Sequence, residues 1–418
     1  MTGRSAGAGQ GGATTAVPSA EAEQWAVSPF NTEGFTGAGA LTSPPLISDC
    51  TLRDGEQQAG LVFSRESKVA IAAMLDGIGV HDIEVGTPAV SEDDRAAIEE
   101  IAALGLRATI SALARATEAD IELVAGTGAD AVRISFPISA RQRAAKLHVD
   151  DSQYISESLR ISRYAKNLGL QVVFSPYDTT RADLPLLERL LRAFRHEGCV
   201  DRVRLVDTVG AASPEGIRFL LGFMRKAAGD IPLEVHCHND FGLGTANTIA
   251  AALAGADYLS VTVNGLGERA GNTPLEEVVV ALKVLYGIDT GVATERLKPV
   301  SDEVERLSGI ALQPHKAVVG ANCFRHETGT VVAGLLRDPF TAEPYAPEVV
   351  GQSRQVVLGK LSGAASVRYK MAELGVDCTD ADVTTILAAV KERSIALRRS
   401  LDDDEVRRIA DDVLGPQV

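Results

Sequence analysis

The chain has 418 residues and a formal net charge of −15. This length suits a barrel of ~250 residues with a smaller appended unit, and an acidic chain without a basic stripe argues against nucleic-acid binding. No apolar run reaches the ~18 residues of a membrane span, and the N-terminus lacks the basic start and apolar core of a secretory signal. Five cysteines without a CxxC pair indicate reduced thiols, and we expect a cytoplasmic protein.

The first 43 residues are rich in Gly, Ala, Ser and Thr and contain few apolar anchors. Such a composition cannot bury enough apolar surface to offset the entropy of ordering. We therefore predict a disordered tail over residues 1–43.

From Leu46 onward, short apolar runs alternate with amphipathic stretches. The predicted strands are 46–51, 82–85, 107–111, 131–136, 171–175, 202–206, 233–237 and 258–263. The predicted helices are 65–78, 91–104, 117–126, 151–168, 183–197, 213–228, 244–254 and 274–286. Eight strands that alternate with eight helices predict parallel βαβ units closed into an α/β (β/α)8 TIM barrel over residues 44–288.

After about residue 288 the alternation stops. We predict a helix near 300–309, an irregular region with Gly and Pro over 310–364, and helices over 364–375 and 380–415. Residues 289–418 are therefore expected to form mostly helical C-terminal subdomains.

Polar residues gather where the predicted strands end, which is where a barrel of this kind carries its active site. His236 and His238 are two apart on a strand, so both imidazoles point to the same face. Asp54 follows the first strand and supplies a third ligand, which leaves coordination positions open for a substrate. Two buried, hydrogen-bonded histidines would be the structural alternative. The pattern favours a divalent-metal site.

Arginines near the end of the fourth strand offer positive charge for a substrate. Arg133 lies on that strand, and Arg141 with Arg143 follows it. They are placed to meet a second anionic group of a substrate, such as a distal carboxylate, phosphonate or phosphinate. Solvated surface arginines are the alternative, and for Arg143 the better one.

Several segments together resemble the signature of the DRE-TIM metallolyases, in the branch of the 2-isopropylmalate, homocitrate and citramalate synthases. The chain looks most similar to short homocitrate synthases, and the resemblance covers about residues 46–375. The motifs that carry it are 49–57 (DCTLRDGEQ), 174–176 (FSP), 207–210 (DTVG), 236–240 (HCHND), 267–272 (GERAGN), 359–360 (GK) and 362–363 (SG).

The resemblance implies an acyltransferase that converts the acyl group into alkyl on transfer, by Claisen condensation of acetyl-CoA with a 2-oxo acid and release of CoA. It implies a divalent metal (Mg, Mn, Co or Zn) on Asp54, His236 and His238, with Asn272 in or near the shell, and a homodimer. The other implied site residues have two roles. Arg53, Gln57 and Thr208 would bind substrate, while Arg53 and Glu268 would take part in catalysis.

Four positions depart from the pattern of the family. Tyr177 stands where a Glu is usual, Val331 replaces an acid/base His that reaches in from the partner subunit, Leu361 replaces a His, and Gln142 replaces a His after the fourth strand. The resemblance therefore leaves the proton-transfer group open. Tyr177 and His326 are our candidates for it.

Three alternatives stay open at this point. The oxo acid of a condensing synthase can carry a phosphonate or phosphinate, as in a phosphinomethylmalate synthase. A metal-dependent lyase would run retro-aldol or retro-Claisen cleavage, and the synthase-like loop at 267–272 speaks against it. A weakened paralogue would only bind an oxo acid. Metal-dependent release of free CoA separates these classes.

Overall fold

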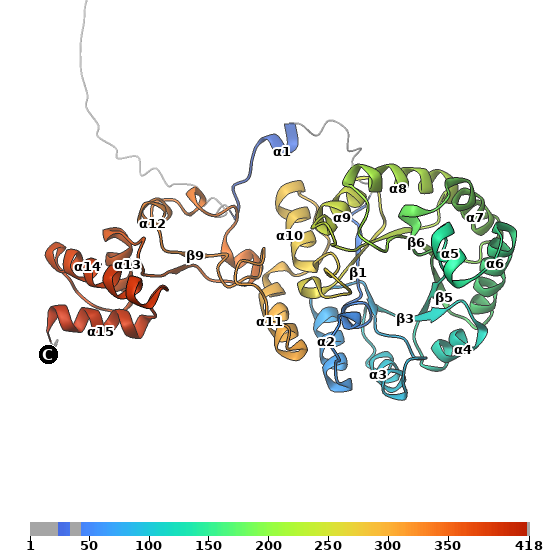
Figure 1. Ribbon diagram of the computed structural model, residues 1–418, viewed down its shortest axis with the longest axis horizontal. Helices are drawn as coiled ribbons and strands as arrows, with labels where there is room; N and C mark the ends of the chain where they lie inside the picture. The colour runs from blue at the N-terminus through green and yellow to red at the C-terminus, as the bar shows by residue number, and fades with distance from the viewer. Residues whose placement is uncertain (1–23, 34–42, 416–418) are drawn as a thin grey trace, which may run out of the picture.

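The computed structural model describes residues 24–33 and 43–415, and most of them form a closed barrel of eight parallel strands (Figure 1). Each strand pairs with the next along the chain, and β1 pairs with β8 to close the ring. The strands are β1 (Leu46–Asp49), β2 (Asp82–Glu84), β3 (Thr109–Arg115), β4 (Ala131–Ser135), β5 (Gln171–Ser175), β6 (Arg202–Asp207), β7 (Leu233–Cys237) and β8 (Tyr258–Val261). The predicted TIM barrel is confirmed.

Eight helices follow the eight strands and form the outer ring of the barrel. They are α2 (Arg65–Gly77), α3 (Glu92–Ala102), α4 (Glu118–Gly126), α6 (Asp151–Asn167), α7 (Leu184–Glu197), α8 (Pro214–Ala228), α9 (Gly244–Leu253) and α10 (Leu275–Tyr286). The side chains of Ser64, Ser91, Thr117 and Ser213 accept backbone N–H groups at four of their N-termini. These caps satisfy donors that the helices leave unpaired, which explains why the predicted starts agree within a residue.

Two helical elements differ from the prediction. A short additional helix, α5 (Ala140–Lys146), follows β4 and is capped by Ser139. Its sequence ARQRAAK has no apolar face, so hydrophobic periodicity gave no signal for it. The predicted tail helix 380–415 is interrupted and forms α14 (Asp380–Leu397) and α15 (Asp403–Leu414).

The interior of the barrel contains a cluster of ionic side chains, whereas barrels of this kind are usually filled by branched apolar ones. Arg133, fully buried, donates to Asp82 and Glu234. Arg204 reaches Glu234 as well. Burial alone would raise the pKa of Glu234, but the surrounding arginines outweigh it and hold that pKa well below its usual range. Burying such a cluster costs desolvation free energy, which offsets the attraction between the charges. We therefore interpret the cluster as a means of fixing charged groups in place, and not as a source of folding stability.

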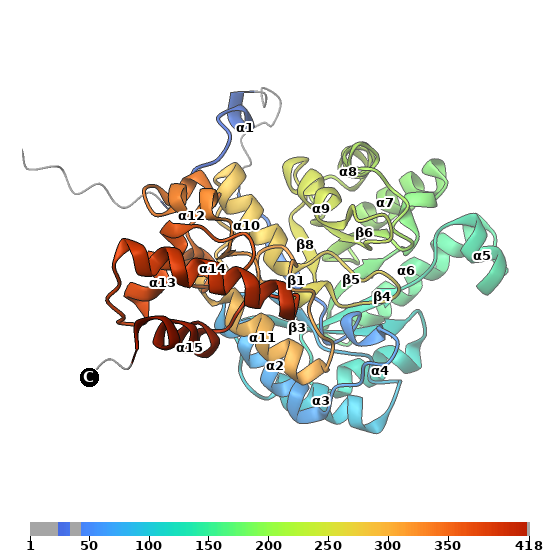
Figure 2. The same ribbon diagram turned by 60° about the vertical axis from the view of Figure 1, so that its left-hand side comes forward.

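The C-terminal region has a hydrophobic core of its own. It contains α11 (Leu297–Ser308) against the barrel, a two-stranded sheet of β9 (Arg325–His326) and β10 (Gln355–Val356), α12 (Gly329–Leu335) and α13 (Ala364–Glu373), followed by α14 and α15. The core residues of this unit include Leu358, Met371, Ile386 and Val390, separate from the barrel core. In Figures 1 and 2, α13, α14 and α15 lie together to one side of the barrel.

Part of the predicted tail is ordered. Trp25 pairs with Tyr345 in an antiparallel bridge, and Ala26 N–H donates to Pro344 O at 3.0 Å. A short helix, α1 (Phe30–Glu33), follows. The prediction of disorder is therefore wrong for residues 24–33, because one aromatic anchor suffices to dock this segment. Residues 1–23 and 34–42 lie outside the described part of the chain.

None of the helices in the described ranges is long and apolar enough to cross a membrane.

Candidate active site

A cavity of about 270 Å³ opens where the carboxyl ends of the strands meet. It is lined mainly by polar side chains from seven strands and the loops that follow them. They are Arg53, Asp54, Gln57, Leu113, Ser135, Gln142, Lys146, Ser175, Tyr177, Arg204, Val206, Thr208, His236, His238 and Glu268. This is the end of the barrel at which the sequence places the chemistry.

Three potential ligand atoms converge in this cavity. The Nε2 atoms of His236 and His238 lie 3.3 Å apart, and Asp54 Oδ2 lies 3.6 Å from the first and 3.7 Å from the second. Donor atoms bound to one ion at ~2.1 Å stand ~3–3.5 Å from each other, so the triangle has nearly the dimensions of a metal site. The structure thus brings together the three ligands that the sequence predicts.

The protonation of these three groups suits metal binding. Burial lowers the pKa of His236 and of His238, so both imidazoles are neutral at neutral pH. Burial would raise the pKa of Asp54, but the charge of Arg53, followed by the neighbouring imidazoles, outweighs it and lowers that pKa to about 2. Two neutral imidazoles and one carboxylate form a donor set that Zn²⁺ and similar divalent ions accept.

Cys50 lies near these groups but outside the ligand set. Its sulfur is within 4.8 Å of ligand atoms of Asp54 and His236. However, it is 4.0 Å from Nδ1 of His236 and 3.4 Å from Ser260 Oγ, on the side away from Nε2. Burial raises the pKa of the Cys50 thiol. Ser260 Oγ lies 2.9 Å from His236 Nδ1 and orients this imidazole.

Asn272 contacts the Asp54 carboxylate from the loop after β8. Its Nδ2 atom donates to Asp54 Oδ2 at 2.6 Å, while its buried Oδ1 has no protein partner in the structure. The loop needs glycine to make this approach. A Cβ on Gly267, whose φ is +152°, would lie 2.2 Å from Asn272 Nδ2, and one on Gly271 would lie 2.0 Å from Gly265 O. The two glycines of the GERAGN motif are therefore required for the backbone path that brings Asn272 to Asp54.

Arg53 is fixed beside the ligand Asp54. Its guanidinium donates to Asp54 Oδ1 at 2.8 Å and to both oxygens of Glu84, at 2.5 and 3.2 Å. Burial alone would lower the pKa of Arg53, but Glu84 and Asp54 outweigh it and raise that pKa, so the charge is permanent. Arg204 holds Glu84 from β6, with Nη2 at 3.0 Å from Oε2. The ionic interior of the barrel thus supports the floor of the cavity.

The loop residues after β6 and β8 complete this side. Thr208 Oγ1 accepts the backbone N–H of Asp178 at 2.7 Å, which leaves the hydroxyl hydrogen free to donate into the cavity. Glu268 and Gln57 also line the cavity. Arg269 donates to Asp240 at 2.9 Å and thereby ties the loop after β8 to that after β7.

Across the cavity, Tyr177 and Lys146 form a contact that the sequence analysis missed. Lys146 Nζ donates to Tyr177 Oη at 3.2 Å and lies 5.0 Å from the centroid of the phenol ring. Lys146 is the last residue of α5, the helix without a periodic signal. Arg204 was missed as well, although Arg202 and Arg204 at alternate positions of a central strand could have indicated inward-pointing charge.

Three predicted site residues do not reach this cavity. Arg133 lies outside the lining, fully buried and paired with Asp82 and Glu234, so the prediction that it binds substrate is wrong: a substrate in the cavity does not reach its guanidinium. Arg141 is exposed on α5 and is not part of the lining. His326 lies on β9 in the C-terminal region, where its Nε2 is 3.0 Å from Glu343 Oε1.

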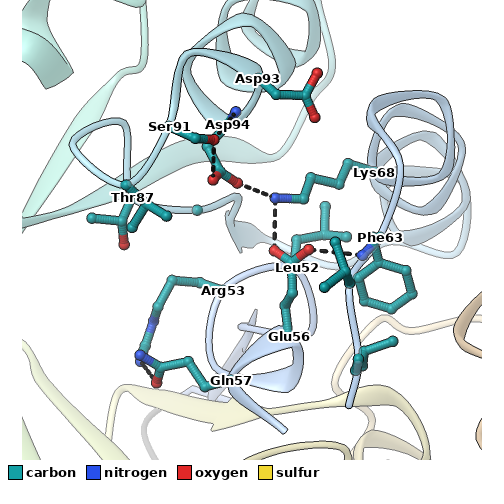
Figure 3. A pocket seen from close by; sticks show the side chains of 14 residues that line it. Leu52, Arg53, Glu56, Gln57, Phe63, Lys68, Thr87, Ser91, Asp93 and Asp94 are labelled. Carbon is teal, nitrogen blue, oxygen red and sulfur yellow. Dashed lines mark hydrogen bonds and ion pairs between the residues drawn. The ribbon is translucent and has the colours of Figure 1, made fainter. Parts of the chain in front are cut away.

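A second cavity of about 310 Å³ adjoins the first and shares Arg53 and Gln57 with it. Figure 3 shows Leu52 and Phe63 at its wall and the ammonium of Lys68 between Glu56 and Asp94. Leu52, Leu61, Val62 and Phe63 give this cavity an apolar wall next to Arg53, and Lys68 on the polar side is paired with two carboxylates.

The fold and this site define a (β/α)8-barrel protein with a candidate metal-binding active site. Comparison with known proteins identifies its family: residues 45–304 match the model described as HMGL-like, and residues 318–400 match the model described as homocitrate synthase post-HMGL domain-like. The chain belongs to the HMGL-like family, in the synthase branch of the DRE-TIM metallolyases, and the prediction of an acyltransferase is confirmed.

The relatives bear names of several synthases. The chain is 44% identical to a putative (R)-citramalate synthase of Methanopyrus kandleri, over 90% of this chain and 75% of that protein. It is 42% identical to 2-isopropylmalate synthase 2 of Caldanaerobacter subterraneus, over 89% and 96%. A hydroxymethylglutaryl-CoA lyase from Pseudomonas aeruginosa shares the fold, with a TM-score of 0.57 at 22% identity over 65% of this chain and 95% of that one.

Proposed function

We propose that the protein catalyses a divalent-metal-dependent Claisen condensation of acetyl-CoA with a 2-oxo acid and releases CoA. The observation that carries this proposal is the triangle of Asp54, His236 and His238 beside a permanently charged Arg53. When bound there, a divalent ion polarises the ketone of a chelating 2-oxo acid and stabilises the negative charge that forms on its oxygen.

The chain's own residues bind and orient the oxo acid. Arg53 supplies a second fixed positive charge next to the ketone oxygen. Its hydrogen bonds to Glu84 hold the guanidinium in this position. The Thr208 hydroxyl donates to the substrate carboxylate. Asn272 and Ser260 hold two of the ligands in place through Asp54 and His236.

The second cavity suits the thioester arm of acetyl-CoA. Its apolar wall accommodates an aliphatic chain, and the shared residues Arg53 and Gln57 bring its inner end to the oxo acid. The acetyl methyl group loses a proton, its carbon forms a bond to the ketone carbon, and water then hydrolyses the thioester to a carboxylate and the free thiol of CoA. Glu268 and Tyr177 both line the cavity; Glu268 is our candidate for holding the proton, and Tyr177 is the alternative.

We also propose a homodimer in which the C-terminal region of one copy approaches the barrel mouth of the other. In its own chain this region lies to one side of the barrel (Figure 2), and it exposes Val331, Leu361 and Ile395, at 40%, 60% and 56%. His326 would reach a cavity only in this way. Analytical ultracentrifugation should show a dimer at micromolar concentration, and an active monomer would contradict the proposal.

The experiment that tests the function measures free thiol during incubation with acetyl-CoA and a panel of 2-oxo acids. We expect release of CoA only when an oxo acid and a divalent metal are both present, and loss of release after chelation. A panel member with a phosphonate or phosphinate tests the alternative synthase. Cleavage of a 3-hydroxyacyl-CoA without condensation would instead identify a lyase.

A further inference from the structure

The cavity has a polar side opposite the metal ligands. Because the strands of the closed barrel run in order from β1 to β8, β4 and β5 lie across the barrel from β8 and β1. The apolar lining residues, Leu113 on β3 and Val206 on β6, flank this side. The polar residues are Ser135, Gln142, Lys146, Ser175 and Tyr177.

Lys146 differs from the other cations of the cavity. Arg53 and Arg204 are each paired with Glu84, and Arg204 also with Glu234. Lys146 instead contacts the hydroxyl and the ring of Tyr177, and no carboxylate in the described ranges forms an ion pair with it. A phenol hydroxyl does not neutralise an ammonium group. The far side of the cavity therefore carries an unpaired positive charge.

We infer that Lys146, with Tyr177, forms a subsite for a second anionic group on the 2-oxo acid. The inference rests on the proposed function, because an oxo acid held at Asp54, His236 and His238 extends its side arm across the cavity. A carboxylate or a phosphonate there would pair with Lys146 and accept a hydrogen bond from Tyr177 Oη.

The other side chains of the subsite agree with a charged arm. Ser135 and Ser175 present hydroxyls and Gln142 presents an amide. A branched aliphatic arm would bury these groups without hydrogen-bond partners, which costs ~1–3 kcal/mol for each. The lining therefore favours a small 2-oxo acid with a second anionic group over a valine-type oxo acid.

The test compares kinetic constants for four oxo acids with acetyl-CoA: pyruvate, 3-methyl-2-oxobutanoate, 2-oxoglutarate and 3-phosphonopyruvate. We expect kcat/KM for at least one dianionic substrate to exceed that for both others by ~10-fold or more. The two dianionic compounds distinguish a carboxylate from a phosphonate arm.

Variants assign the preference to the subsite. Lys146→Met should raise KM for the preferred dianionic substrate by ~10- to 100-fold with kcat little changed, and should leave pyruvate within ~3-fold. Lys146→Arg should keep the preference. Tyr177→Glu places a carboxylate beside Lys146 and should abolish it. Lys226→Met, the same substitution at an exposed position of α8, is the control.

A binding measurement separates this inference from the proposed function. Calorimetric titration of the oxo acids into metal-loaded protein, without acetyl-CoA, reports the subsite even where turnover fails. A lower affinity of Lys146→Met for the dianionic compounds alone supports the inference. Equal affinities of wild type and Lys146→Met, or preference of the wild type for 3-methyl-2-oxobutanoate, overturn it. Absence of CoA release with every oxo acid overturns the proposed function instead.

Discussion

The two sides of the barrel mouth are built differently. On the side of β7, β8 and β1, the functional side chains are buried or nearly so, and three of them are held by another: His236 by Ser260, Asp54 by Asn272 and Arg53 by Glu84. On the side of β4 and β5, Tyr177 is half-buried and Lys146 is exposed at the end of a short helix. The first side is preorganised for charge stabilisation, which loses effect when the groups move. Residues on the second side can be substituted without disturbing that arrangement. We therefore expect this side to determine the choice of substrate.

The largest effect should come from removing a ligand on the first side. His236→Ala should lose bound metal and reduce turnover by ~1,000-fold or more while the barrel stays folded, because one of three donors is gone. Elemental analysis and circular dichroism check this. Cys50→Ala is the matched control and should keep its metal, since the thiol lies on the other face of His236. Full metal occupancy in His236→Ala would place the site elsewhere.

A smaller effect should follow from loosening the support of a ligand. Ser260→Ala removes the partner of His236 Nδ1 at 2.9 Å and should weaken metal affinity by ~10- to 100-fold. Competition with a chelating indicator measures this. Unchanged affinity would show that packing alone fixes the imidazole. It would contradict the view that hydrogen bonds preorganise the first side.

The pH dependence of the free energy of unfolding tests the electrostatic environment of Asp49, a buried residue of β1. Burial raises its pKa to about 7, and its Oδ2 has no hydrogen-bond partner. Between about pH 4 and pH 7 the unfolded chain releases this proton while the folded chain keeps it, so the contribution of Asp49 to stability falls as pH rises through that window. Asp49→Asn should therefore gain ~1–3 kcal/mol over wild type at pH 8 and much less at pH 5. Urea unfolding at both pH values checks this, and an equal difference at both would contradict it.

The smallest effect on turnover should come from the second side. Tyr177→Phe removes the acceptor of Lys146 and a donor to the side arm, yet leaves the metal ligands untouched. We expect kcat within a few-fold of wild type and a changed preference among oxo acids. A loss of ~100-fold or more in kcat, with oxo-acid binding unchanged, would instead make Tyr177 the proton-transfer group.

The barrel and the three candidate metal ligands could be proposed from the sequence because their signals are local, and the structure brings these three side chains together. Hydrophobic alternation marks the βα units and side-chain caps mark most of the helix starts, and His236 with His238 two residues apart already defines two donors. The fate of Arg133 could not be predicted, because its partners Asp82 and Glu234 are distant in sequence and meet it only in the closed barrel. Lys146 was missed because its short helix has no apolar face, and because its partner Tyr177 follows a different strand, β5.

The central claim, a metal-dependent condensation at the buried side, is tested most directly by following carbon from acetyl-CoA labelled with ¹³C at the methyl group. With a 2-oxo acid and a divalent metal, we predict one product in which the labelled carbon is bonded to the former ketone carbon, and one free CoA for each product molecule. Chelation, or His236→Ala, should abolish both signals. Release of CoA with the label left in free acetate would show thioester hydrolysis without condensation and would contradict the account.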